Sequence, residues 1–151
     1  MNMGDQRISV ETRAVRITLR TGVQLEGELF LQMHGAHQFG PQRVGEVLNG
    51  AEPFIPLRHE GKIDLLNLHQ VIAVETSASD EFDELLRLGK EYRVEVHMTA
   101  GPALQLATFV SLPDEHNRIK DFLNQGRKFL LFLQDDRVVY LAGKEIVRVI
   151  D

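Results

Sequence analysis

The stretch RVGEVLNGAEPFIPLRHEGKIDLLNLHQVIAVET, residues 43–76, recurs in altered form as RIKDFLNQGRKFLLFLQDDRVVYLAGKEIVRVID, residues 118–151. The two stretches align without a gap at an offset of 75 residues (118 minus 43). Many matching positions keep their size, charge or polarity, as in Arg43/Arg118, Glu46/Asp121, Asn49/Asn124 and Phe54/Phe129. The residues upstream match more loosely, at an offset of 79. Self-similarity of this length predicts that one structural unit occurs twice.

Each copy contains five short segments with the character of β-strands. Between residues 15 and 19, for example, apolar and polar residues alternate, which is typical of a half-buried strand. Five short strands with a kink before the last are the order found in small SH3-like or Sm-like barrels. The sequence therefore predicts a mainly β fold of two tandem five-stranded barrels, at residues 8–76 and 91–151, joined by a short helical linker at 77–90.

The third strand differs between the two copies. Residues 129–133 of the second copy are all apolar, so both faces of this strand should be buried, one of them against the first copy or another chain. The first copy has Pro56 in its third strand, and because proline cannot donate to a strand ladder, Pro56 predicts an edge position.

Two helical segments are expected. The pattern Arg-x-x-acid-x-Leu-Asn places its apolar residues on one face of a single helical turn, with the arginine able to pair with the acid. The closing asparagine, Asn49 or Asn124, suits the left-handed conformation that often ends short helices. In the linker, serine caps, early acids and a closing glycine predict a helix over 80–89, with its apolar stripe packed between the barrels.

Composition restricts the compartment and the partners. The chain has 151 residues, a formal net charge of −5 and no cysteine, so disulfides, thiolate nucleophiles and Cys-ligated zinc are excluded. The acidic balance argues against nucleic-acid binding, which usually needs a basic field. The N-terminal residues have no signal-peptide pattern, and no apolar run is long enough to span a bilayer. We expect a soluble cytoplasmic protein with no membrane contact.

The first unit resembles the Sm-like barrel family. The resemblance is carried by Leu25-Glu26-Gly27-Glu28-Leu29, which is similar to the apolar-x-Gly-x-Leu pattern of that family's second strand, and by the turn that ends in Asn49. The duplicated pattern also resembles uncharacterised bacterial proteins. The resemblance implies a tandem Sm-like or SH3-like barrel, and it implies RNA binding at Asn49 and Asn124. The second copy departs from the pattern, with Leu106 in place of the glycine.

Four recurring polar residues are the candidate binding residues, namely Arg43, Arg118, Asn49 and Asn124. The two arginines could grip a phosphate or carboxylate across a pseudo-twofold axis. Alternatively, each arginine pairs with its own acid and caps the helical turn. His34 and His37 lie in a glycine-containing loop and are interpreted as polar loop residues. No catalytic constellation, metal site or cofactor motif is evident.

Three functions follow as hypotheses. The first is a non-enzymatic interaction module that binds a protein partner or itself through an exposed strand edge or the groove between the barrels. The second is sensing of a small anionic ligand or nucleotide in that groove, held by Arg43 and Arg118. The third is RNA binding by analogy with Sm-like proteins.

Overall fold

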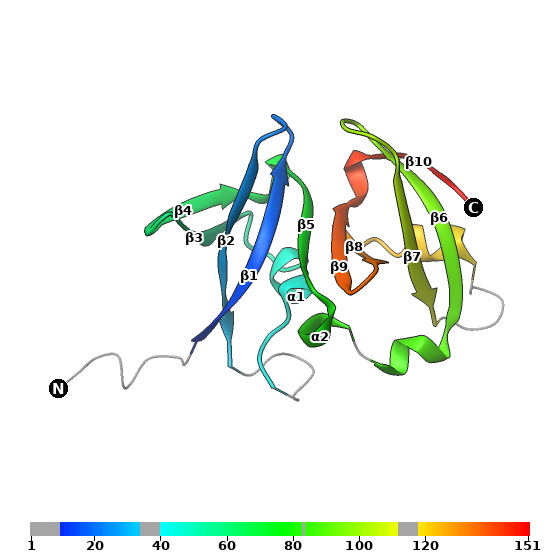
Figure 1. Ribbon diagram of the computed structural model, residues 1–151, viewed down its shortest axis with the longest axis horizontal. Helices are drawn as coiled ribbons and strands as arrows, with labels where there is room; N and C mark the ends of the chain where they lie inside the picture. The colour runs from blue at the N-terminus through cyan, green and yellow to red at the C-terminus, as the bar shows by residue number, and fades with distance from the viewer. Residues whose placement is uncertain (1–9, 34–39, 83, 112–117) are drawn as a thin grey trace.

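The order of the strands shows how the two halves of the chain are joined. In the computed structural model, which describes residues 10–33, 40–82, 84–111 and 118–151, ten antiparallel strands form one sheet in the order β10-β6-β7-β8-β9-β5-β1-β2-β3-β4 (Figure 1). The first-half strands are β1 (Val10–Leu19), β2 (Gln24–Gln32), β3 (Phe54–His59), β4 (Lys62–Asn67) and β5 (Val71–Ser77). The second-half strands are β6 (Lys90–Met98), β7 (Leu104–Val110), β8 (Phe129–Gln134), β9 (Arg137–Ala142) and β10 (Ile146–Ile150).

Corresponding strands follow the same order in both halves. The first half reads β5-β1-β2-β3-β4 and the second reads β10-β6-β7-β8-β9, and β5 pairs with β9 to join them. Strand β5 thus meets the second-half counterpart of β4, which leaves β4 and β10 at the two ends of the sheet. The prediction of a mainly β fold is confirmed, and the sheet is not closed into a barrel.

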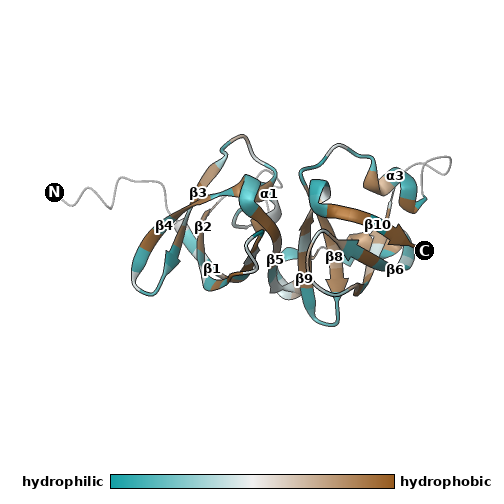
Figure 2. Ribbon diagram, turned by 90° about the horizontal axis from the view of Figure 1, so that it is seen from above, coloured by the Kyte–Doolittle hydropathy of each residue, from teal (hydrophilic) through white to brown (hydrophobic). Residues whose placement is uncertain are grey.

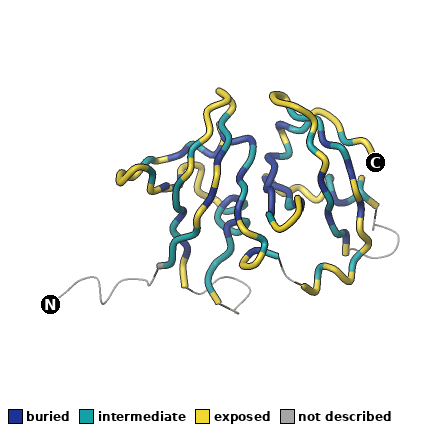
Figure 3. Tube along the Cα trace, viewed as in Figure 1, coloured by how far each residue is buried: buried dark blue, intermediate teal, exposed yellow. Residues whose placement is uncertain are grey.

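Two apolar cores share strands β8 and β9 between them. On β8, Phe129 and Leu133 pack into a core formed mainly by the first half, whereas Leu130 and Phe132 pack into the core of the second half. Successive side chains of a strand point to opposite faces, so an all-apolar strand can serve two cores at once. The prediction that residues 129–133 bury both faces is confirmed. Figures 2 and 3 show this apolar, buried region where the halves meet.

Short helices connect the strands. The α-helices are α1 (Val44–Leu48), α2 (Ala78–Glu81) and α3 (Ile119–Leu123), and the 3-10 turns are η2 (Leu68–Gln70), η3 (Glu84–Leu88) and η5 (Gly143–Glu145). Helices α1 and α3 confirm the predicted single turns. The prediction that the two asparagines adopt the left-handed conformation is wrong, because φ is −95° at Asn49 and −98° at Asn124. Each side-chain amide instead donates to the carbonyl four residues earlier, Gly45 or Lys120, which ends the turn without positive φ.

The position of Pro56 differs from its prediction. Strand β3 lies between β2 and β4 and is not an edge strand. However, β2 pairs with β3 only at Leu57 and Arg58, and Pro56 lies just outside that pairing. The missing N–H of Pro56 is therefore tolerated inside the sheet because the ladder on that side has already ended.

The linker does not form the predicted single helix over residues 80–89. Helix α2 ends at Glu81, and Phe82 adopts an extended conformation (φ −96°, ψ 121°) before η3 begins. The ring of Phe82 lies 5.8 Å from that of Phe109, and the guanidinium of Arg87 lies 4.9 Å above the Phe82 ring. Contacts made by Glu81 and Phe82 with other parts of the chain thus override the local helical preference.

Candidate functional site

The junction between the halves is an antiparallel strand pair. Five residue pairs connect β5 with β9, from Ala73 opposite Leu141 to Ser77 opposite Arg137. Val74 is fully buried there and Tyr140, opposite it, is 4% exposed. Outside the strands, Asn49, Glu81 and two lysines reinforce the same junction. Strand pairing and side chains from both halves therefore hold this junction together.

Glu81 is a buried carboxylate at the centre of this junction, with 1% of its surface exposed. Its Oε2 atom accepts from Nη1 of Arg13 at 2.8 Å and from the backbone N–H of Val44 at 2.9 Å. Its Oε1 atom accepts from the hydroxyl of Tyr140 at 2.7 Å and from the N–H of Gly45 at 3.3 Å. The carboxylate thereby satisfies the first N–H groups of α1 and ties them to β9.

Gly45 and Tyr140 approach each other closely beside this carboxylate. A Cβ atom on Gly45 would lie 2.7 Å from the Tyr140 hydroxyl oxygen and 2.8–2.9 Å from two ring carbons, so only glycine fits without movement. Burial raises the pKa of Tyr140 well above its ordinary value, and the Glu81 carboxylate raises that pKa further. Tyr140 therefore stays protonated and acts as a hydrogen-bond donor to Glu81.

Asn49 connects the end of α1 to the first residue of β8. Its Oδ1 atom accepts from the N–H of Phe129 at 2.8 Å, and its Nδ2 atom donates to the carbonyl of Phe129 at 3.1 Å. Among the described residues, the side chain of the corresponding Asn124 makes only the bond within its own turn, to the carbonyl of Lys120 at 2.8 Å, and is exposed. One of the two recurring asparagines therefore holds the halves together, while the other faces solvent.

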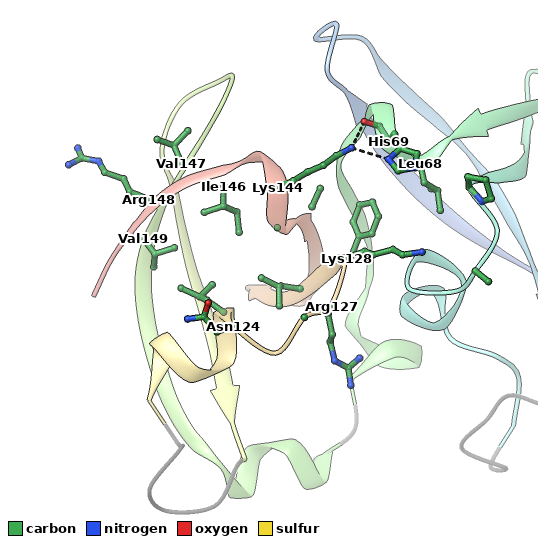
Figure 4. Close-up of a pocket in the computed structure, with 18 of the residues that line it drawn as sticks. Leu68, His69, Asn124, Arg127, Lys128, Lys144, Ile146, Val147, Arg148 and Val149 are labelled. Carbon is green, nitrogen blue, oxygen red and sulfur yellow. Dashed lines mark hydrogen bonds between the residues drawn. The ribbon is translucent and has the colours of Figure 1, made fainter.

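A groove of 850 Å³ opens between the halves (Figure 4). Lys128 and Lys144 reach from the second half to the first, where they donate to the carbonyls of Gly50 at 2.7 Å and His69 at 2.9 Å. The other charged residues of the lining are Glu52, Arg127 and Arg148. Within the described part of the chain, neither lysine forms an ion pair with a carboxylate. The groove is therefore cationic, although the chain as a whole is acidic.

Arg43 and Arg118 are placed separately. Arg43 lines a second groove together with Asn49 and Glu81, whereas Arg118 pairs with Asp121 at 3.2 Å. Because β5 pairs with β9 rather than with its own counterpart β10, the halves are related head to tail and not by a twofold axis. The strand pairing therefore does not provide the twofold axis across which the two arginines were expected to face each other.

The two end strands carry an unusual share of the exposed apolar side chains. On β4 and the start of β3 these are Ile63, Leu65 and Phe54, and on β10 they are Val147 and Ile150. Leu65 is 70% exposed, although its counterpart Tyr140 is 4% exposed. Strands β5 and β9 are thus buried in the middle of the sheet, whereas their counterparts β10 and β4 are open at its ends.

Comparison with known proteins adds no family to this description. No protein-family model, curated protein or solved structure matches the chain. Within the described ranges, no helix is long and apolar enough to cross a membrane, and no three metal-ligating side chains lie together. His34 and His37 lie outside those ranges.

Sequence reasoning missed Glu81 and Tyr140. Glu81 stands in a run of acids that is typical of a helix N-terminus, and nothing local distinguishes it from its exposed neighbour Asp80. The available signal was a difference between the copies. Gly45 and Tyr140 occupy positions where the other copy has Lys120 and Leu65.

Proposed function

We propose that this chain is a non-enzymatic interaction module, built as two Sm-like units, that binds protein through the edge strands β4 and β10. One observation carries the proposal. Strand β9, the counterpart of β4, pairs with β5, the counterpart of β10, and this pair is buried at the centre of the sheet. Strands β4 and β10 themselves lie at the two ends of the sheet, where each has one unpaired edge. An unpaired strand presents backbone N–H and C=O groups to which another strand can add.

The exposed apolar residues support the same conclusion. Val147 on β10 is exposed, whereas its counterpart Ile72 on β5 is buried. Natural edge strands are usually protected by charges, prolines or bulges when they must stay unpaired. Leu65, at the middle of β4, is a large apolar residue in such a position. Edges of this composition are suited to being covered by a partner.

The test uses single charges placed on the edges. The full tagged chain is cross-linked in the cells that produce it, and the protein retained with it is measured, including untagged copies of the chain. Leu65→Lys and Val147→Lys should each abolish this retention. Leu88→Lys is the matched control, because Leu88 is an exposed apolar residue on η3, away from both edges. Circular dichroism should show that all three variants are folded. Unchanged retention by both edge variants would disprove edge-mediated binding.

The cationic groove favours a second candidate function, the binding of a small anion such as a nucleotide. The sequence assigned this role to Arg43 and Arg118. Arg43 lines the second groove, whereas the 850 Å³ groove is lined by Lys128, Lys144 and Arg127. Carbonyl partners hold these lysines without neutralising them. A nucleotide that binds the native state should raise the melting temperature of the wild type but not of Lys128→Gln. No shift with any nucleotide would contradict this function.

A further inference from the structure

The β5–β9 junction is a template for the two unpaired edges. Adding 75 to the residue numbers of β5 gives those of its counterpart β10, and subtracting 75 from the numbers of β9 gives those of its counterpart β4. The observed pair Glu75 opposite Val139 thereby becomes Ile150 opposite Asp64. We propose that β10 of one chain pairs antiparallel with β4 of a second copy in this register, so that copies assemble head to tail. This inference rests on the proposed function and names its partner as the chain itself.

The asparagine contact has the counterpart that this assembly needs. Inside the chain, Asn49 binds both backbone groups of Phe129. The counterparts of these two residues are Asn124 and Phe54, and they lie on opposite sides of the proposed junction. Asn124 is exposed with its side-chain oxygen uncommitted among the described residues, and Phe54 is 54% exposed although Phe129 is 3% exposed. Head-to-tail docking would reproduce the asparagine bridge between chains.

The side chains at the new junction are complementary in size. Inside the chain, Gly45 provides the space that the ring of Tyr140 occupies. At the proposed junction, Lys120 replaces the glycine and Leu65 replaces the tyrosine, so a larger residue on α3 meets a smaller one on β4. Leucine lacks the hydroxyl and the outer ring atoms that a Cβ on Gly45 would meet, so Leu65 leaves the space for the Lys120 Cβ that Tyr140 does not leave at Gly45.

The proposed contact uses two different surfaces and therefore has a direction. Every copy that binds leaves one β10 and one β4 unpaired, so assembly continues until the rotation between copies closes a ring, or extends as a filament. A twofold dimer would instead pair β4 with β4 or β10 with β10. The two arrangements can be separated by cross-linking.

Cysteine pairs test the register directly, because the chain has no cysteine of its own. Directly opposite residues of antiparallel strands have Cα atoms about 4.5–5.5 Å apart, within the range of a disulfide. A mixture of full-length Ile150→Cys and Asp64→Cys chains should therefore form a disulfide-linked dimer under mild oxidation, and neither variant alone should. The control is a mixture of Ile150→Cys and Leu65→Cys chains. It should form no disulfide, because a shift of one residue puts the two side chains on opposite faces.

Light scattering tests the asparagine bridge. The wild type should exceed the mass of one chain, and Asn124→Ala should weaken assembly about tenfold to thirtyfold, as expected for two lost hydrogen bonds. Gln125→Ala, next to it and also exposed, should assemble like the wild type. A cross-link in either single cysteine variant, or none in the mixture, would overturn the inference. If the mixture gives none while Leu65→Lys still abolishes retention of another protein, the proposed function stands and only self-assembly fails.

Discussion

Replacing Glu81 by alanine should be among the most destabilising single changes in this chain. The carboxylate accepts four hydrogen bonds, from Arg13, Tyr140 and two backbone N–H groups of α1. Removing one partner of a buried ion pair costs about 3–5 kcal/mol, because the other charge is left without compensation. Arg13 also pairs with Glu11 at 3.2 Å, and the variant retains this ion pair. The cost should therefore lie in the lower half of that range. We therefore expect a loss of about 3–4 kcal/mol in the free energy of unfolding.

Urea unfolding followed by circular dichroism measures this difference. The matched control is Glu84→Ala, since Glu84 pairs with Arg87 at 3.1 Å but both side chains are largely exposed. An exposed pair contributes about 0–1 kcal/mol. If Glu81→Ala lies within about 1 kcal/mol of this control, with an unchanged slope against urea, the carboxylate does not hold the junction and the reasoning is refuted.

Three further changes probe the same junction. Asn49→Ala should lower the unfolding free energy by about 2–4 kcal/mol and Asn124→Ala by about 1 kcal/mol, because only Asn49 also bonds Phe129; urea midpoints at low protein concentration check this. Gly45→Ala should lower the melting temperature by roughly 2–12 °C, since overpacking costs about 1–3 kcal/mol, and an unchanged melting temperature would contradict the close contact. Above about pH 10 the unfolded chain loses the Tyr140 proton while the native state, with its raised pKa, retains it. Stability should therefore fall with rising pH more steeply in the wild type than in Tyr140→Phe, and parallel curves would exclude that cause.

Local patterns were sufficient to predict the single units of structure. Apolar spacing identified the one-turn helices α1 and α3, because three or four neighbouring residues decide whether a turn has an apolar face. The unbroken run on β8 predicted that both of its faces are buried, since alternation is lost only where neither face meets water.

Contacts between distant residues could not be predicted in this way. Glu81 binds groups that are 36 to 68 residues away in sequence, and no local pattern specifies such partners. The same contacts interrupted the linker helix at Phe82. The β5–β9 pairing was also hidden, because the alternation of a strand identifies its buried face but not the strand beside it.

The positions at which the two copies differ explain why one junction is internal and the other open. Tyr140 and Lys128 bind across the internal junction, and their counterparts, Leu65 and Pro53, cannot make the same hydrogen bonds. The asparagine bridge, by contrast, is available in both copies. A junction between chains would therefore retain the strand pairing and the Asn124 contact but lack the buried carboxylate network. Such a junction should be weaker than the internal one, so that assembly depends on protein concentration while each chain keeps its own halves together.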